Sequence, residues 1–360
     1  MSKKNTTAEE YHRQFADRII DQIKRGVAPW QKPWKPGERV LPHNLHTDRP
    51  YAGGNSLHLA VVAEERGYSD TRWGTYRQIQ LQGGHVRKGE RGTRILSYQD
   101  HRRVAVKDPQ GRPVTDENNR QVYRYERLPK PWIKRYTVFN AEQANRLPAP
   151  PEPTEKAIWD AHLEADKVLK ECGVDIRHVE GDRAYYRLKT DDIVLPKWKQ
   201  FPSANQYYQT ALHEVGHATG HPERMNRESL IKGVEAGFGS QIYAREELRA
   251  EISAMMTGER IGVGHDPSRG AAYVESWVEV LEKDPREIRR AAADAQKISD
   301  YILEHTRQRE AEREPEAAKD VASPTPTDPA RQQDQDQSFT VAVRQARTVP
   351  VPSRNISPSR

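Results

Sequence analysis

The sequence predicts an α+β protein with an N-terminal α+β domain and a C-terminal, mainly helical domain that contains a small sheet. Apolar residues recur at helical spacing near the start of the chain and again from Ala204 to about Thr306. Between these regions, segments rich in β-branched and aromatic residues predict strands. Residues 147–155 contain four prolines and predict a linker. The expected parts are therefore 1–146, the linker 147–155, 156–306 and a tail over 313–360.

The N-terminal domain is expected to begin with helices and to end with strands. Over Ala8–Arg25, the residues Phe15, Ile19 and Ile23 share one helical face, and Gly26 can end the helix. Further elements are predicted in this order: helices from Asn55 to Gly67 and from Trp73 to Gln82, then strands at Thr93–Tyr98, Val104–Lys107, Val122–Arg127 and Ile133–Val138.

The C-terminal domain is expected to be mostly helix. Thr154 can cap a helix over Glu155–Glu171, and short strands are predicted at Ala184–Leu188 and Asp192–Leu195, before the helices that start at Ala204. From residue 313 onward the chain is rich in Pro, Gln, Asp, Ser and Arg and almost lacks aromatic residues. Because such a composition cannot bury a core, the tail over 313–360 is predicted to be disordered.

Several absences in the sequence bear on the compartment. No apolar run reaches the roughly 20 residues that a membrane-spanning helix needs, and the first residues lack the apolar stretch of a signal peptide. Cys172 is the single cysteine, so no intrachain disulfide can form. These features predict a protein of the reducing cytoplasm that has no membrane partner.

The net charge of +6 is unevenly distributed. Residues 1–150 hold 28 Lys and Arg against 16 Asp and Glu, a net charge of +12, whereas residues 151–360 hold 30 against 36, a net charge of −6. A basic half of this kind favours a polyanionic partner, because phosphate contacts release counterions. A solvated basic face without a partner is the alternative.

The segment His213-Glu214-Val215-Gly216-His217 predicts a metal site. Ser203 and Gln206 can form a capping box that starts a helix just before it. Because residues four apart lie one turn apart on a helix, both imidazoles can bind one ion while Glu214 acts as the general base. The alternative is a pair of ordinary surface or core histidines.

A catalytic zinc ion needs a third protein ligand, and the predicted helix Tyr243–Met256 offers one. Glu247 and Glu251 are four residues apart and share a face. We expect Glu247 to bind the metal and Glu251 to hold the other nitrogen of a ligand histidine. The reverse assignment stays open, as does a solvated acidic face.

Two further features can complete a catalytic cleft. The strand Asp192–Leu195 fits an edge strand that could hold an extended peptide by main-chain pairing. Tyr273 or His265 could support the oxyanion, although spacing fixes neither of them. The alternative for Tyr273 is packing with Trp277, which lies four residues further along a helix.

The N-terminal half combines cations with aromatic residues. From Arg72 to Arg135 there are 16 Lys and Arg and 6 Asp and Glu, interleaved with rings that include Tyr123, Tyr125 and Trp132. Cations that follow phosphates and rings that stack on bases are typical of single-stranded-DNA binding, although a ring on a strand is more often part of a core. The candidate DNA-binding residues are Trp30, Lys35, Tyr51, Arg72, Trp73, Tyr76, Arg87, Lys88, Arg91, Arg94, Lys134 and Arg135.

Several distinctive motifs follow one another in a fixed order along the chain. In the first half these motifs are APWQKPW, RPYAGGNSLHL, TRWGTYRQIQLQGGHVRKGERGTRI and YTVFNAEQ. In the second half they are LHEVGHATGHPERMNR, YAREELRAE and AAYVESWVEVLEKDPREIRRAAADAQKISDYI. With these motifs the chain resembles the ArdC-type antirestriction proteins of conjugative plasmids, whose N-terminal domain is shared with some plasmid TraC-type primases. The resemblance covers about residues 8–304.

This resemblance implies a single-stranded-DNA-binding domain, a zincin-like metallopeptidase domain and protection of plasmid DNA during conjugation. Zinc is the expected ion, with another divalent ion such as manganese as the alternative. The implied partners are single-stranded DNA and a protein, either a peptide substrate or a restriction enzyme. Two other functions stay open: a pure DNA-binding module whose metal site serves folding alone, and a primase accessory protein.

Overall fold

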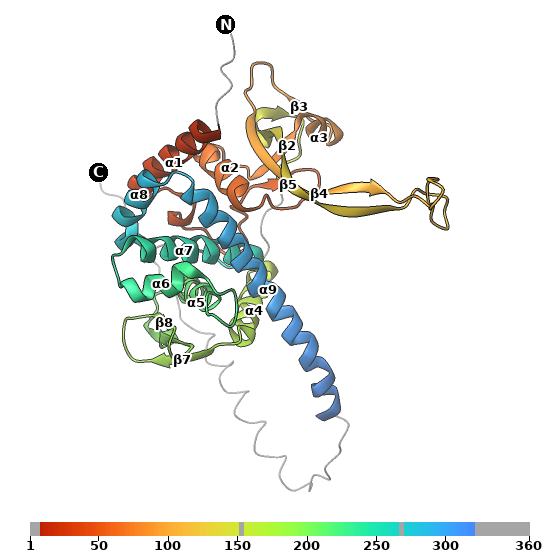
Figure 1. Ribbon diagram of the computed structural model, residues 1–360. Coiled ribbons are helices and arrows are strands. Elements are labelled where there is room, and N and C mark those ends of the chain that lie inside the picture. Colours follow the sequence, from red (N-terminus) through yellow and green to blue (C-terminus); the bar gives the residue numbers. More distant parts are fainter. Residues whose placement is uncertain (1–7, 151–154, 266–269, 321–360) are drawn as a thin grey trace, which may run out of the picture. The chain divides into compact units, whose positions relative to one another are not determined.

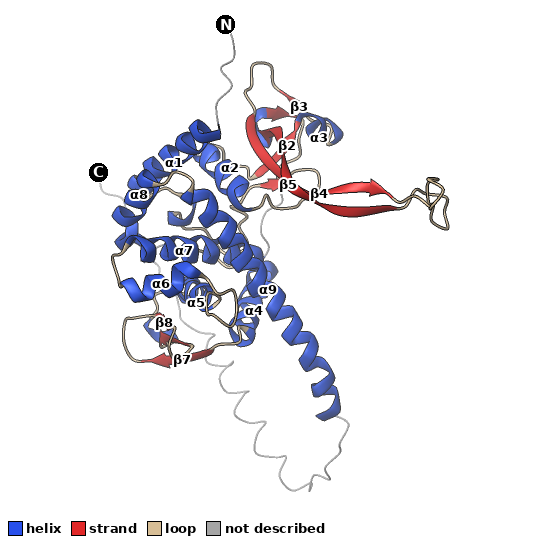
Figure 2. Cartoon of the chain, viewed as in Figure 1, coloured by secondary structure: helices blue, strands red, loops and turns tan. Residues whose placement is uncertain are grey.

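The computed structural model describes residues 8–150, 155–265 and 270–320, and these residues form an α+β fold (Figure 1). Figure 2 colours the elements by type. The helices are α1 (Ala8–Lys24), α2 (Gly53–Arg66), α3 (Tyr76–Leu81), α4 (Glu155–Glu171), α5 (Ala204–Ala218), α6 (Glu228–Ala236), α7 (Gln241–Ile261), α8 (Val274–Lys283) and α9 (Glu287–Asp320). The strands are β1 (His43–Asn44), β2 (Arg72–Thr75), β3 (His85–Val86), β4 (Thr93–Ala105), β5 (Tyr123–Asn140), β6 (Ala144–Asn145), β7 (Asp175–Val179), β8 (Tyr185–Arg187) and β9 (Asp192–Pro196). Four 3₁₀ turns connect them: η1 (Pro29–Gln31), η2 (Ala141–Gln143), η3 (Trp198–Gln200) and η4 (Gly270–Tyr273). Among the described helices, none is long and apolar enough to cross a membrane.

The N-terminal sheet has the strand order β1-β2-β5-β4. Four short strands were expected between Thr93 and Val138, but the structure has two long ones, β4 and β5. The two strands pair as an antiparallel hairpin, and this pairing keeps the polar residues between the predicted strands extended as well. The predicted helix from Trp73 is wrong at its start, since Trp73 lies in β2, opposite Asn140. The helix α3 begins only after Thr75, whose side chain accepts a hydrogen bond from the Gln78 amide.

The C-terminal half places a three-stranded sheet beside a set of helices. The helix α4 has the predicted bounds, and α1 in the N-terminal half has its predicted bounds to within one residue. The sheet order is β7-β9-β8, so the prediction that Asp192–Leu195 forms an edge strand is wrong: β9 is central and β8 lies at an edge. The strand β7 was not predicted, because its sequence DIRHV is mostly polar and mostly exposed.

The linker and the tail lie partly outside the described residues. Residues 147–150 have no regular structure, and residues 151–154 are outside the described part of the chain. Residues 313–320, which were expected to be disordered, continue α9 to Asp320. The rest of the predicted tail, 321–360, also lies outside the described residues.

One hydrophobic core joins the two halves of the sequence. It is built from buried residues of α1, η1 and α2 together with residues of α7, α8 and α9, among them Phe15, Trp30, Leu248 and Trp277. Trp30 and Trp277 meet edge to face with their ring centroids 6.2 Å apart. A second core lies between α4, α5 and the β7-β9-β8 sheet, and a third lies between α2 and the N-terminal sheet. The helix α7 therefore contacts η1 of the N-terminal half as well as α5, the helix that carries the two predicted histidine ligands.

Candidate functional site

The helix α5 carries the two predicted histidine ligands side by side. It starts at Ser203, whose hydroxyl accepts a hydrogen bond from the Gln206 amide at 3.2 Å. One helical turn separates His213 from His217, and their Nε2 atoms lie 3.1 Å apart. The two ring nitrogens thus converge on one point.

Gly216 explains how α7 comes close enough to complete the site. A Cβ at Gly216 would lie 2.8 Å from the hydroxyl of Ser253 and 3.7 Å from the Cα of Ala250, both on α7. Because no side chain intervenes, the two helices pack closely at the level of the histidines. The middle of the motif therefore needs a small residue for packing, in addition to its two histidines.

Glu247 on α7 faces both imidazoles. Its carboxylate oxygens lie 3.4 Å from Nε2 of His213 and 3.3 Å from Nε2 of His217. One ligand atom from each of these three residues fits within a group no wider than 4.8 Å. Two imidazole nitrogens and one carboxylate oxygen are a donor set that suits zinc and related divalent ions. In the described part of the chain, no fourth residue joins this group.

Glu251 lies behind His213. Its carboxylate is 3.6 Å from Nδ1 of His213, the ring nitrogen that faces away from Glu247. This placement supports the assignment of Glu247 to the metal and of Glu251 to the support of a ligand histidine. Glu247 and Glu251 are both buried, so this side of α7 is not a solvated acidic face.

Glu246 is a residue of the site that sequence reasoning missed. It is fully buried, and its carboxylate lies 3.2 Å from Nδ1 of His217. Arg227 donates to both of its oxygens, at 2.6 and 2.9 Å, and the Ser229 hydroxyl donates at 2.6 Å. Glu246 therefore supports His217 in the same way as Glu251 supports His213. Arg227 compensates the buried negative charge of Glu246. The only signal in the sequence was its position next to Glu247.

The carboxylates set the protonation of this cluster. Burial alone would lower the pKa of His217, but Glu247 and Glu246 outweigh burial and raise the pKa well above its usual value. Burial would raise the pKa of Glu247, yet His217 and His213 hold it below its usual range. Glu251 differs, since burial raises its pKa. The histidines and carboxylates of the site thus form a compact set of oppositely charged groups.

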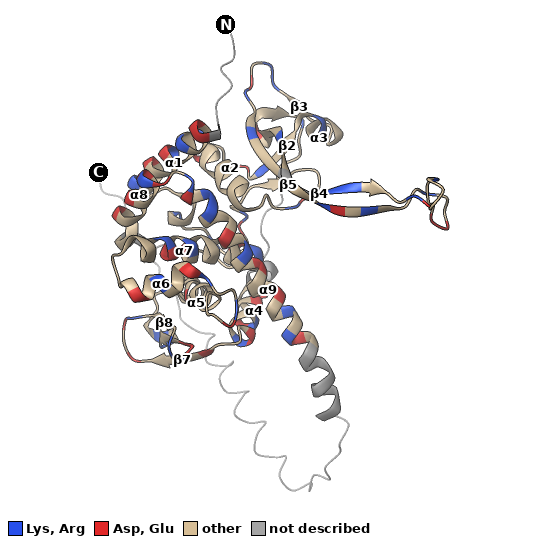
Figure 3. Cartoon of the chain, viewed as in Figure 1, with Lys and Arg blue, Asp and Glu red and all other residues tan. Residues whose placement is uncertain are grey.

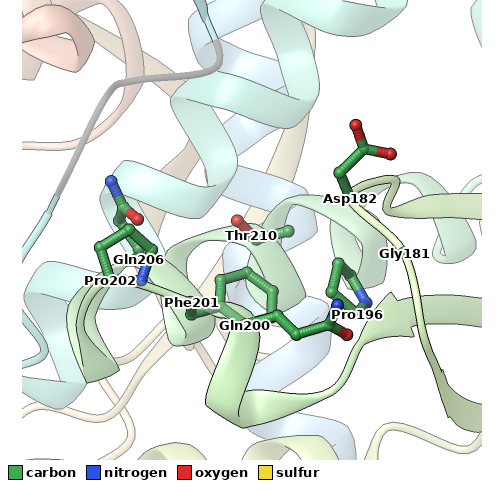
Figure 4. Close-up of a pocket in the computed structure, with 8 residues that line it drawn as sticks. All are labelled: Gly181, Asp182, Pro196, Gln200, Phe201, Pro202, Gln206 and Thr210. Atoms are coloured by element: carbon green, nitrogen blue, oxygen red, sulfur yellow. The ribbon is translucent and has the colours of Figure 1, made fainter.

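A cavity of about 950 Å³ opens onto the three candidate ligands and Glu214. The edge strand β8 lines one side, whereas Leu230, Val234 and Phe238 give the cavity an apolar wall. A second cavity of about 410 Å³ shares Asp182 and Thr210 with the first (Figure 4). The first cavity, beside β8, is large enough for a short peptide.

The structure separates the two candidates for oxyanion support. His265 is buried, stacks on Trp34 and bonds through Nε2 to the carbonyl of Trp30 at 2.7 Å, so it packs against the N-terminal half instead of the cavity. Tyr273 lines the cavity. Burial and the neighbouring Glu247 raise the pKa of Tyr273 to about 12, so its hydroxyl keeps its proton and can donate a hydrogen bond.

The candidate DNA-binding residues fall into two groups. Trp30 and Trp73 are buried in cores, so the prediction that they stack on bases is wrong. Tyr51 is half-buried against Asn44, and Arg72 pairs with Asp70 at 2.7 Å. The others are exposed: Lys35, Tyr76, Arg87, Lys88, Arg91, Arg94, Lys134 and Arg135. Figure 3 shows Lys and Arg along both strands of the β4–β5 hairpin.

Four further exposed rings lie on that hairpin. Tyr123, Tyr125, Trp132 and Tyr136 expose between 40% and 74% of their surface. The sequence named them among the interleaved aromatics but gave no reason to select them, because exposure on a strand depends on which face the rest of the fold covers.

Two families match the chain. Residues 9–139 match the N-terminal domain of anti-restriction factor ArdC, and residues 163–294 match the zincin-like metallopeptidases. Two Escherichia coli proteins described as DNA primase TraC are 46% and 47% identical over 295 and 296 residues, which is 81% of this chain. The chain spans only about a fifth to a quarter of their length, with 20% and 27% of them covered.

One relative and two solved structures match this chain over most of its length and over most of their own length. An uncharacterised protein of Sinorhizobium fredii, y4eC, is 34% identical over 85% of this chain and 95% of its own length. Crystal structures of the antirestriction ArdC protein from plasmid R388, one metal-free and one with Mn(II), match with a TM-score of 0.61 at 33% identity. They cover 82% of this chain and 98% and 97% of theirs. With both family regions in order and this coverage, the chain belongs to the family of ArdC antirestriction proteins.

Proposed function

We propose that this protein is a metal-dependent peptidase joined to a single-stranded-DNA-binding region, which accompanies plasmid DNA during conjugative transfer and protects it. The observation that carries the peptidase part is the convergence of His213, His217 and Glu247 at a cavity that also contains Glu214. Those three residues would hold the ion, which is expected to be zinc, with manganese as the alternative because a related ArdC structure contains Mn(II).

The residues of the chain have distinct roles in this proposal. The ion, when bound, supplies a Lewis acid at the head of the cavity. Glu214 accepts the proton of the attacking water and later delivers it to the leaving amine. Tyr273 donates a hydrogen bond to the developing oxyanion, and the edge strand β8 aligns an extended peptide by main-chain pairing. Glu246 and Glu251 fix the two imidazoles.

The DNA-binding part rests on the N-terminal family match and on charge. Residues 1–150 have a net charge of +12, and exposed aromatic side chains lie among the exposed cations. Single strands offer both phosphates and unpaired base faces to such a surface. A protein partner, either a peptide substrate or a restriction enzyme, and a place in the cytoplasm complete the proposal.

A binding module with a purely structural ion is the second candidate. A structural zinc site is closed by four protein ligands, whereas the converging group within the described residues has three and faces a cavity. Because a purely structural site gives no role to a general base in that cavity, Glu214 favours the peptidase.

The test is hydrolysis of a quenched-fluorescence peptide library by the full chain loaded with zinc or with manganese. The Glu214→Gln variant is the control, because it keeps the ligands and loses the base. We expect cleavage by the wild type and none by the variant, at equal metal content. Equal cleavage by both proteins would assign the activity to a contaminant. No cleavage by a metal-loaded wild type would favour the binding module.

A further inference from the structure

The two faces of the β4–β5 hairpin differ in what they expose. In the strand register, Tyr136 lies opposite Ile95 and Tyr125 lies opposite Arg103. The register shifts between the pairs Gln99–Trp132 and His101–Arg127. Because Gln99 and His101 are two residues apart on β4, Trp132 and Arg127 still share that face. One face therefore carries, along its length, the residues that we call the stripe: Arg103, Tyr123, Tyr125, Arg127, Trp132, Lys134 and Tyr136.

The stripe continues the face that packs on α2. Nearer the sheet, Ile95 and Val138 on this face are buried against Leu59 and Val62 of α2. Asn55, near the start of α2, bonds to the amide and the carbonyl of Leu96, at 3.2 and 2.6 Å. Beyond that point the rings are open to solvent, with 66% of Trp132 and 74% of Tyr125 exposed. A row of exposed rings of this kind indicates an interaction surface.

The cations of the stripe differ from those of the opposite face. On the opposite face, Glu126 pairs with Arg102 at 2.9 Å and with Arg124 at 2.7 Å. On the stripe, the Arg103 guanidinium lies over the Tyr123 ring, 3.6 Å from its centroid. Arg127 and Lys134 form no ion pair with any side chain that the structure describes. The stripe therefore presents positive charge that an anionic partner can neutralise. On the opposite face, Glu126 already neutralises part of the positive charge of Arg102 and Arg124.

The spacing of the stripe favours an extended strand as that partner. Alternate residues of a strand are about 7 Å apart, so Trp132, Lys134 and Tyr136 form a ring–cation–ring series about 14 Å long. Bases of a duplex advance by only about 3.4 Å and hide their faces within the stack. An unpaired strand can stretch, place bases on successive rings and bring phosphates to the cations between them.

We propose that single-stranded DNA lies along the stripe, with bases stacked on Trp132, Tyr125 and their neighbouring rings and with phosphates at Arg127 and Lys134. This inference rests on the proposed single-stranded-DNA binding and assigns it to one face of one hairpin. None of the stripe residues except Lys134 is among the candidates selected from the sequence.

The experiment uses the full chain and measures the binding of a fluorescein-labelled oligothymidylate by anisotropy, with a duplex of equal length as the second probe. We expect Trp132→Ala and Tyr125→Ala each to weaken single-strand binding about tenfold and duplex binding much less. Arg127→Ala should reduce the slope of log affinity against log salt by about 0.7. The matched controls lie on the opposite face: Ile133→Ala beside Trp132, and Arg124→Ala for Arg127. Both controls should bind as the wild type does.

The outcomes separate this inference from the proposed function. If the wild type fails to bind the oligothymidylate at low salt, the single-stranded-DNA function itself is wrong. If the wild type binds and the stripe variants bind equally well, the function stands and the stripe is not its site. Equal losses on both faces would overturn the stripe in favour of a general basic surface. Trp132→Phe, which keeps a ring, should retain most of the affinity and thus distinguishes loss of stacking from loss of folding.

Discussion

The candidate metal centre and the hairpin stripe differ in how their charged side chains are placed: those of the centre are buried and those of the stripe are exposed. At the metal centre, Glu246, Glu247 and His217 are buried and each has oppositely charged neighbours. On the stripe, Arg127 and Lys134 are exposed between exposed rings. The side chains of the buried cluster are held by contacts within the protein, whereas the charged heads of Arg127 and Lys134 are open to solvent. A fixed geometry suits chemistry on a bond, and an open row of rings and cations suits a long partner of variable sequence.

The largest expected effect is the loss of the ion from the metal centre. His213→Ala should abolish the binding of about one divalent ion per chain, because two of the three ligands cannot close a tight site. Glu214→Gln should keep the ion. Metal content measured by mass spectrometry after dialysis decides both, and an ion lost from Glu214→Gln would make Glu214 a ligand.

The same measurement tests the separate roles of Glu247 and Glu251. Glu247→Ala should lose the ion, while Glu251→Ala should weaken binding by only about 10- to 100-fold. Retention by Glu247→Ala together with loss by Glu251→Ala would exchange their roles. DNA binding should be unchanged in both variants, because the stripe lies on a different element.

Two tryptophans test the difference between a buried and an exposed ring. Trp30→Ala should lower the free energy of unfolding by about 3–5 kcal/mol, because it leaves a cavity in the shared core next to Trp277. Trp132→Ala should leave the free energy of unfolding unchanged and weaken only the binding of single-stranded DNA. Urea unfolding followed by circular dichroism makes the comparison. A strong destabilisation by Trp132→Ala would mean that its ring is packed in solution.

Two glutamates extend the same contrast to charge. Glu246→Ala leaves Arg227 buried without its carboxylate partner and should cost about 3–5 kcal/mol of stability. Glu126→Ala removes the partner of Arg102 and Arg124 on the exposed hairpin and should not shift the urea midpoint measurably. Similar shifts for both variants would contradict the distinction between the two regions.

The smallest effect concerns Glu259, at the end of α7, where burial raises the pKa to about 7. Its folded pKa lies above the unfolded value, so the native state binds more protons between about pH 4.5 and 7 and stability falls as pH rises through that window. Glu259→Gln removes this loss and should raise stability relative to the wild type at pH 8 by an amount on the order of 1 kcal/mol, with no gain at pH 4.5. A difference that is constant with pH would show that Glu259 titrates normally.

The sequence predicted that His213, His217 and Glu247 converge, because this arrangement depends on one helical turn of α5 and on a second strong helix, α7. His213 and His217 lie together on α5 for purely local reasons. Glu246 escaped prediction because its role depends on Arg227, which reaches it from outside α7. The sequence also could not show that Trp73 is buried and Trp132 exposed, since the register of β4 and β5 and the extent of α2 decide this. Features that depend on one element were predictable, and those that depend on packing between elements were not.

The core that α7 shares with α1, η1 and α2 has an evolutionary consequence. If recombination replaced only one half of the chain, buried apolar side chains of the other half, such as Trp30 or Leu248, would lose the surface that covers them. The Escherichia coli relatives match over 295 and 296 residues, more than either half of this chain contains, although each relative is several times longer. The N-terminal region and the zincin-like region are thus expected to be inherited together, so that a substitution on one side of the shared core can be compensated on the other.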